Sequence, residues 1–139
     1  SLQLQAYVSA EQHMYRHSLA HAFMVTEFIV DQKYAVSNNH HGFRQKLIKL
    51  CDDSGLPFCE TCKTDLNNEC VAPTSNRETI ENGAICINRV RLKRNEWMHG
   101  HAEISEIAAI EAIRISEALI KDQYGINLTA SVQCSVVVW

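Results

Sequence analysis

The sequence has no hydrophobic run that approaches the roughly 20 apolar residues needed to cross a bilayer. Its first residues lack the basic and then apolar pattern of a secretory signal peptide. A large excess of one charge sign is missing too, because the formal net charge is −3. These absences predict a soluble protein without a membrane segment, and they argue against broad electrostatic capture of nucleic acid.

The chain also has no need of disulfide bonds. Six cysteines could form three disulfides in a secreted protein, but a chain with 46% hydrophobic residues can bury a core without them. We therefore favour a reducing cytoplasm as the location. The first residue is Ser1 and not methionine, which we expect of a tag remnant, a processed protein or a domain cut from a longer chain.

A single domain covering residues 1–139 is expected from the length. Its N-terminal part, residues 1–54, is predicted to be helical, because apolar side chains recur at helical spacing from Leu4 to about Gln32 without proline or glycine. A second helix is predicted from about Gly42 to Cys51. Residues 55–83 hold both prolines and three clustered cysteines, and are predicted to form a long cysteine-rich connection.

The last part, residues 84–139, is predicted to contain a strand, a helix and a strand. Alternating residues favour a strand or a tight hairpin over residues 84–92, with the basic run of residues 89–94 as a charged strand face and not as a nucleic-acid contact. An apolar helix from His101 to about Tyr124, ended by Gly125, has the wide stripe expected of a helix on a sheet. The predicted class is thus α/β, a small central sheet packed by helices, with an N-terminal helical segment and a Cys-rich loop.

The tripeptide His101-Ala102-Glu103 is the first candidate for chemistry. An imidazole can ligate a divalent metal, and a carboxylate two residues later can reach a metal-bound water without joining the coordination sphere. The metal lowers the pKa of that water and the carboxylate moves its proton, as hydrolysis requires. The alternative is a chance match on an exposed first helical turn, where the helix dipole favours glutamate.

The surrounding sequence supports the interpretation of His101-Ala102-Glu103 as a metal-binding motif. Residues 82–88 read NGAICIN, and together with the H-x-E motif and the Ala/Ile-rich helix they resemble the zinc-dependent cytidine-deaminase superfamily over about residues 80–125. The resemblance implies that His101 is a zinc ligand and Glu103 the catalytic acid/base. It also implies zinc as the cofactor and a nucleobase, a nucleoside or single-stranded nucleic acid as the substrate.

That family carries a P-C-x-x-C motif after its H-x-E, which supplies two more zinc ligands. Here the C-x-x-C of Cys59 and Cys62 comes before the H-x-E, and only Cys134 follows it. Two interpretations stay open. Either Cys59 and Cys62 fold back to complete a site with His101 in a rearranged topology, or the resemblance is superficial.

The clustered cysteines have an independent interpretation as a C-x7-C-x2-C-x7-C pattern. Four thiolates can hold zinc in a closed tetrahedral site that stabilises a fold and performs no chemistry. Metal binding by at least Cys59 and Cys62 is favoured over free thiols or disulfides. Cys86 and Cys134 stand alone in apolar surroundings, where buried free thiols are expected. The proposed alternative site consists of Cys51, Cys59, Cys62 and Cys70.

Histidines recur every four residues at His13, His17 and His21, and form one stripe on the first predicted helix. Adjacent members of such a stripe can share a metal. A solvated or interface-forming face is favoured, because no carboxylate accompanies the histidines at the same spacing.

Two functions are therefore carried forward. The first is a zinc-dependent hydrolytic deaminase-like domain, which in this family is also found as a toxin or effector domain. The second is a non-catalytic binding module with a structural four-cysteine zinc site and a protein partner.

Overall fold

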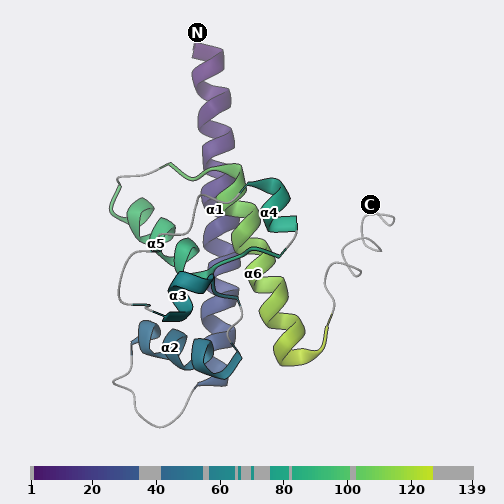
Figure 1. Cartoon of the computed structure of the whole chain (residues 1–139). Helices are drawn as coiled ribbons and strands as arrows, with labels where there is room; N and C mark the ends of the chain where they lie inside the picture. The colour runs from purple at the N-terminus through teal and green to yellow at the C-terminus, as the bar shows by residue number, and fades with distance from the viewer. Residues whose placement is uncertain are drawn as a thin grey trace.

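The computed structural model shows helices joined by turns and irregular segments in the part of the chain that it describes (Figure 1). It describes residues 2–34, 42–54, 57–64, 66, 70, 76–81, 83–100 and 103–126, without the side chains of residues 2–9 and 79. The helices are α1 (Leu2–Lys33), α2 (Phe43–Ser54), α3 (Glu60–Thr64), α4 (Arg77–Glu81), α5 (Ile87–Met98) and α6 (Glu106–Tyr124).

The predicted α/β class with a central sheet is wrong, because the described residues contain no strand. The segment predicted as a strand near 84–92 is instead the loop before α5 and the first half of α5. The spacing of Ile87 and Val90 explains the difference, since both side chains are buried and lie one helical turn apart. The predicted strand after residue 126 lies outside the described residues.

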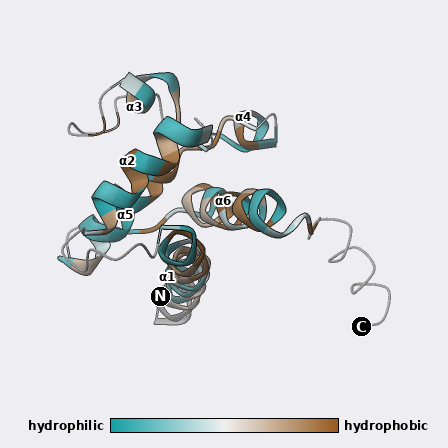
Figure 2. Ribbon diagram, turned by 90° about the horizontal axis from the view of Figure 1, so that it is seen from below, coloured by the Kyte–Doolittle hydropathy of each residue, from teal (hydrophilic) through white to brown (hydrophobic). Residues whose placement is uncertain are grey.

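The long first helix was predicted correctly and forms one side of the molecule. One face of α1 is buried at a spacing of three or four residues, through Leu19, Phe23, Thr26 and Val30. This face packs along α6, and the α1–α6 contact is the most extensive one between described helices. α1 also contacts α2 and α5. Figure 2 shows α1 at the edge of the group, with α6 between α1 and α4.

The predicted apolar helix before Gly125 was also found, and its ends have clear causes. The side chain of Ser105 caps α6 by accepting a hydrogen bond from the backbone N–H of Ala108, 3.1 Å away. Gly125 ends the helix with φ 71°, a left-handed conformation that favours glycine. The helix therefore begins after Glu103, which we had placed in its first turn. It packs against helices and not against a sheet.

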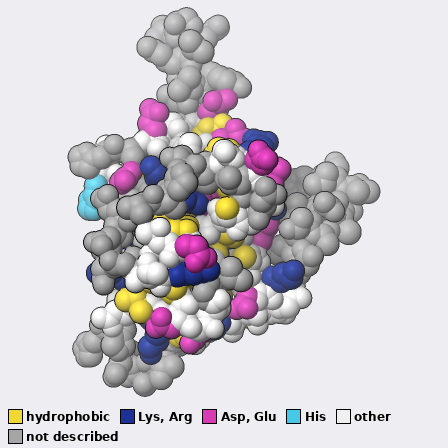
Figure 3. Space-filling view, viewed as in Figure 1, with side chains coloured by type: hydrophobic (Ala, Val, Ile, Leu, Met, Phe, Trp, Pro, Cys, Tyr) yellow, Lys and Arg dark blue, Asp and Glu magenta, His cyan; other side chains and the backbone are white. Residues whose placement is uncertain are grey.

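The basic run of residues 89–94 lies on α5 and makes contacts within the molecule. Arg89 pairs with Glu111 on α6, Arg94 pairs with Glu27 on α1, and Arg91 donates to the neighbouring Asn88. Figure 3 shows acidic and basic side chains interspersed on the face it views. The basic run therefore forms ion pairs that connect α5 to α6 and to α1.

Among the described helices, none has an apolar stretch long enough to cross a membrane.

Candidate metal centre

Four cysteine sulfurs lie together where α3 meets the start of α5. The sulfurs of Cys59, Cys62, Cys70 and Cys86 are all within 4.8 Å of one another, and all four cysteines are free thiols. The Sγ of Cys59 is 3.6 Å from that of Cys70, and the Sγ of Cys70 is 3.9 Å from that of Cys86. A disulfide would need an S–S distance of about 2.05 Å, so the sulfurs are gathered without being bonded.

The distances fit a single metal ion of the size of zinc. Zinc–sulfur bonds of about 2.3 Å in a tetrahedral arrangement place the sulfurs about 3.8 Å apart. The Cys59–Cys70 and Cys70–Cys86 sulfur separations of 3.6 and 3.9 Å lie on either side of that value, and the other pairs are within 4.8 Å. The four cysteines are therefore arranged so that they could hold one metal ion.

Three of the four cysteines are positioned by the starts of α3 and α5. Cys59 directly precedes α3 and its carbonyl accepts a hydrogen bond from the N–H of Lys63, so that the C-x-x-C motif occupies the first turn of the helix. Cys86 is the N-cap of α5, where the helix dipole favours a thiolate. The N–H of Ile87 donates to the carbonyl of Pro57, which ties the start of α5 to the segment before α3.

Two sets of hydrogen bonds support the group, one at the sulfur of Cys62 and one at the backbone of Cys86. Asn88, which is fully buried, donates from Nδ2 to the Sγ of Cys62 at 3.3 Å, and Arg91 donates to the Oδ1 of Asn88 at 2.8 Å. In the second set, Arg89 and the backbone N–H of Cys86 both donate to the buried carboxylate of Glu111. Such supporting contacts orient metal ligands and tune their basicity.

Burial and hydrogen bonding give the thiols different acidities. Burial raises the pKa of Cys62, against the hydrogen bond from Asn88, and raises the pKa of Cys86 to about 11. Burial also acts to raise the pKa of Cys59, but hydrogen bonds from Cys62, Cys70 and Cys86 outweigh it and leave this pKa below its ordinary value. Holding the buried sulfurs as thiolates thus needs a compensating positive charge, which a metal ion supplies.

The structure distributes the predicted site residues as follows. It brings Cys59, Cys62 and Cys70 together and adds Cys86, which we had expected to be an isolated buried thiol. Cys51 lies outside the group, on the buried face of α2. His101 and Cys134 lie outside the described residues.

Glu103 is exposed in the segment that leads into α6. Gln12 of α1 holds this segment, because its side-chain amide exchanges two hydrogen bonds with the backbone of Ile104, at 2.5 and 2.9 Å. In Figure 1 the beginning of α6 lies near the upper half of α1, whereas α3 lies lower, beside α2. Among the residues that the structure describes, Glu103 has no hydrogen-bond or ion-pair partner that would mark it as a proton shuttle.

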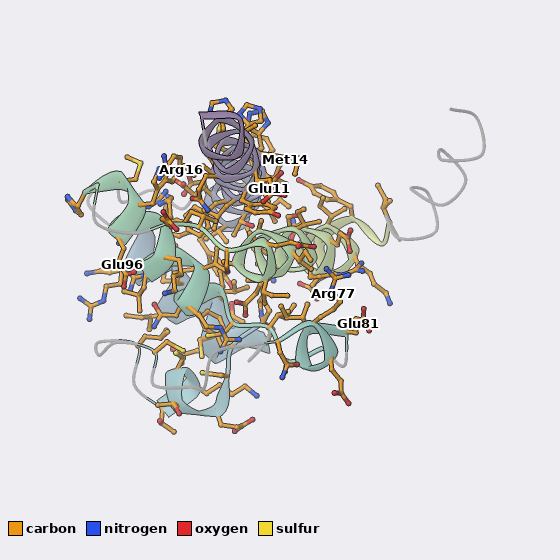
Figure 4. All side chains as sticks on the ribbon, turned by 90° about the horizontal axis from the view of Figure 1, so that it is seen from above. Glu11, Met14, Arg16, Arg77, Glu81 and Glu96 are labelled. Atoms are coloured by element: carbon orange, nitrogen blue, oxygen red, sulfur yellow. The ribbon has the colours of Figure 1, made fainter. Side chains whose placement is uncertain are left out.

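A separate cleft of about 310 Å³ opens between α4 and α6. Figure 4 shows Arg77 and Glu81 on α4, beside α6. The described residues that line the cleft include no cysteine or histidine, and Glu103 is not among them. They are Arg77, Glu81, Ile110, Ile113, Arg114 and Glu117.

Comparisons of the chain with protein families, with curated proteins and with solved structures found no match. The class of the molecule is therefore defined by its own geometry, a helical fold that carries a group of four cysteines.

Proposed function

We propose that the chain is a non-catalytic binding module in which Cys59, Cys62, Cys70 and Cys86 hold a structural zinc ion and the helices present a surface to a protein partner. The observation that carries this proposal is the closeness of the four sulfurs, all within 4.8 Å. Soft thiolate ligands in a tetrahedral set favour zinc over the harder divalent cations.

A shell of four thiolates explains why the module is proposed to be non-catalytic. Catalytic zinc sites keep one coordination position for water, whereas structural sites fill all four positions with protein ligands. Here four sulfurs are available, and the two with most of their surface buried, Cys62 and Cys86, are 1% and 0% exposed. The deaminase hypothesis, in which His101 joins Cys59 and Cys62, stays a prediction that no described contact supports.

The benefit of such an ion lies in what its ligands connect. Cys59 directly precedes α3 and Cys62 lies in it, whereas Cys70 follows α3 in the chain and Cys86 is the N-cap of α5. The helix α3 has only five residues, with Cys62 as its buried residue, so it has little hydrophobic contact of its own. A bound ion would fix this segment on α5 and leave α1, α2 and α6 as the larger supporting frame.

The experiment compares metal content across single alanine variants of purified protein. Wild type should contain one zinc per chain, and Cys62→Ala or Cys86→Ala should lose it. Cys51→Ala is the matched control, because Cys51 is also buried and free but lies outside the group. Wild-type protein without bound metal, or equal loss of metal in the control, would overturn the proposal. Bound iron in place of zinc would overturn the choice of metal.

A further inference from the structure

The outward face of α1 carries a regular stripe that the core does not use. We call it the outer stripe: Ala10, Met14, His17, His21, Met24 and Phe28, all exposed in the described structure. The three large apolar members, Met14, Met24 and Phe28, are 56%, 65% and 59% exposed. In Figures 2 and 4, α5 and α6 lie together on one side of α1. The outer stripe is on the opposite side of α1 from the buried face.

The spacing of the outer stripe is that of a coiled-coil seam. Successive members are separated by four, three, four, three and four residues, which is the a and d pattern of a heptad. This order of spacings reads the same in both directions along the helix. A second copy of α1 laid antiparallel would therefore match the seam to itself, as the two-fold interfaces of homodimers require.

The residues as well as the spacings are complementary in that arrangement. Around a two-fold axis midway between His17 and His21, the small Ala10 meets the large Phe28 of the second copy, and Met14 meets its Met24. The central position brings His17 of one copy against His21 of the other. A small side chain opposite a large one, and two flexible methionines opposite each other, can pack closely between two helices.

The two central histidines lie close enough on one helix face to supply two ligands to one metal ion. The rings of His17 and His21 have centroids 4.1 Å apart, whereas His13 and His17 are 6.2 Å apart. Histidines at positions i and i+4 of a helix can bind one divalent metal ion. Two imidazoles leave a tetrahedral ion with two open positions, and the described residues offer no third ligand to this pair. The second copy offers two more imidazoles at the same place.

We propose that α1 pairs antiparallel with α1 of a second copy, and that His17 and His21 of both copies bind one divalent transition-metal ion at the centre of the seam. The seam rises about 27 Å along the helix, and its short length and central polar residues make apolar burial alone a weak driving force. Metal binding by the histidines supplies the remaining free energy for pairing. This inference names the partner of the proposed binding module, and it uses no residue of the four-cysteine centre.

The test is sedimentation equilibrium of the full chain, with and without one equivalent of Ni²⁺ for every two chains. Imidazole suits nickel well, and the all-thiolate centre is present in every variant compared. Wild type should shift from monomer to dimer on addition of Ni²⁺, with one ion bound per dimer. His17→Ala and His21→Ala should each remove the shift, because each deletes two of the four ligands.

His13→Ala is the matched control, since His13 is exposed on the same helix but lies outside the outer stripe. It should dimerise with Ni²⁺ as wild type does. A further variant, Phe28→Lys, should weaken the dimer at least tenfold while leaving the helical circular-dichroism signal unchanged. A monomer that binds Ni²⁺ without pairing, or equal loss of pairing in the His13 variant, would overturn the inference. Since zinc content of the cysteine centre is measured separately, failure here is distinguishable from failure of the proposed function.

Discussion

The carboxylate of Glu111 accepts a hydrogen bond from the backbone N–H of Cys86, with 3.0 Å between the two atoms. Glu111 is 2% exposed and is also paired with Arg89. Through these contacts, one side chain in the middle of α6 pairs with a partly buried arginine and fixes a candidate metal ligand at the start of α5. The core of the fold and the candidate metal centre therefore depend on the same carboxylate.

Glu111→Ala is expected to destabilise the protein by about 3–5 kcal/mol, because it removes the nearly buried carboxylate that pairs with Arg89 and accepts from the backbone of Cys86. Asp122→Ala is the control on the same helix, since Asp122 pairs with Lys33 at an exposed site and should change stability by about 1 kcal/mol or less. Denaturant unfolding measures both. Similar losses in the two variants would show that the Glu111 contacts add no special stability.

Zinc binding is expected to weaken as the pH falls. Burial raises the pKa values of Cys62 and Cys86, so their sulfurs hold protons firmly and the ion must displace them. For each proton that binding releases, the apparent affinity for zinc falls about tenfold when the pH falls by one unit. Competition with a chromophoric chelator at several pH values measures this slope. An affinity that does not change with pH would mean that the cysteines do not bind as thiolates.

Packing of α6 against α1 can be tested with two alanine variants of one helix. Leu119 is 4% exposed and Ile113 is 39% exposed. Leu119→Ala should cost about 2–5 kcal/mol through loss of burial and formation of a cavity, whereas Ile113→Ala should cost less than about 1 kcal/mol. Thermal unfolding separates the two. A larger loss for Ile113 would place the opposite face of α6 in the core.

Glu103→Gln distinguishes the structural proposal from the catalytic hypothesis. Because Glu103 is exposed and outside the cysteine group, the variant should keep wild-type zinc content and melting temperature. Neither protein should release ammonia from free bases, nucleosides or single-stranded nucleic acid. Under the deaminase hypothesis wild type would show activity, and the variant would lose about 10²- to 10⁴-fold of it.

The sequence predicted three helices close to their observed positions, α1, α2 and α6, and the two long ones have uninterrupted periodicity. In α1 and α6 the apolar spacing continues over many turns, and Gly125 marks the end of α6 as predicted. The short α5 was missed because the alternation of Arg89, Val90 and Arg91 also suits a strand. Tertiary packing decided between the two, since Arg89 reaches Glu111 and Val90 enters the core.

The candidate metal centre could be predicted only in part. The short spacing of Cys59 and Cys62 marked them as candidate ligands. The equal spacing on either side of that pair led to the wrong inclusion of Cys51 as a ligand. Cys51 continues the buried face of α2 after Leu47, a helical pattern that could have marked it as a packing residue. Cys86 carried no comparable signal, because its nearness to the others depends on how α5 folds back on α3.

The positions of the four cysteines in the chain also bear on the speed of folding. All of them lie within residues 59–86, whereas the contact between Gln12 and Ile104 joins residues 92 positions apart. Closing a short loop costs less entropy than closing a long one, and local contacts form sooner. A metal ion present from the start of refolding should therefore organise α3 and the beginning of α5 early. The two long helices, α1 and α6, would then meet on a segment that is already in place.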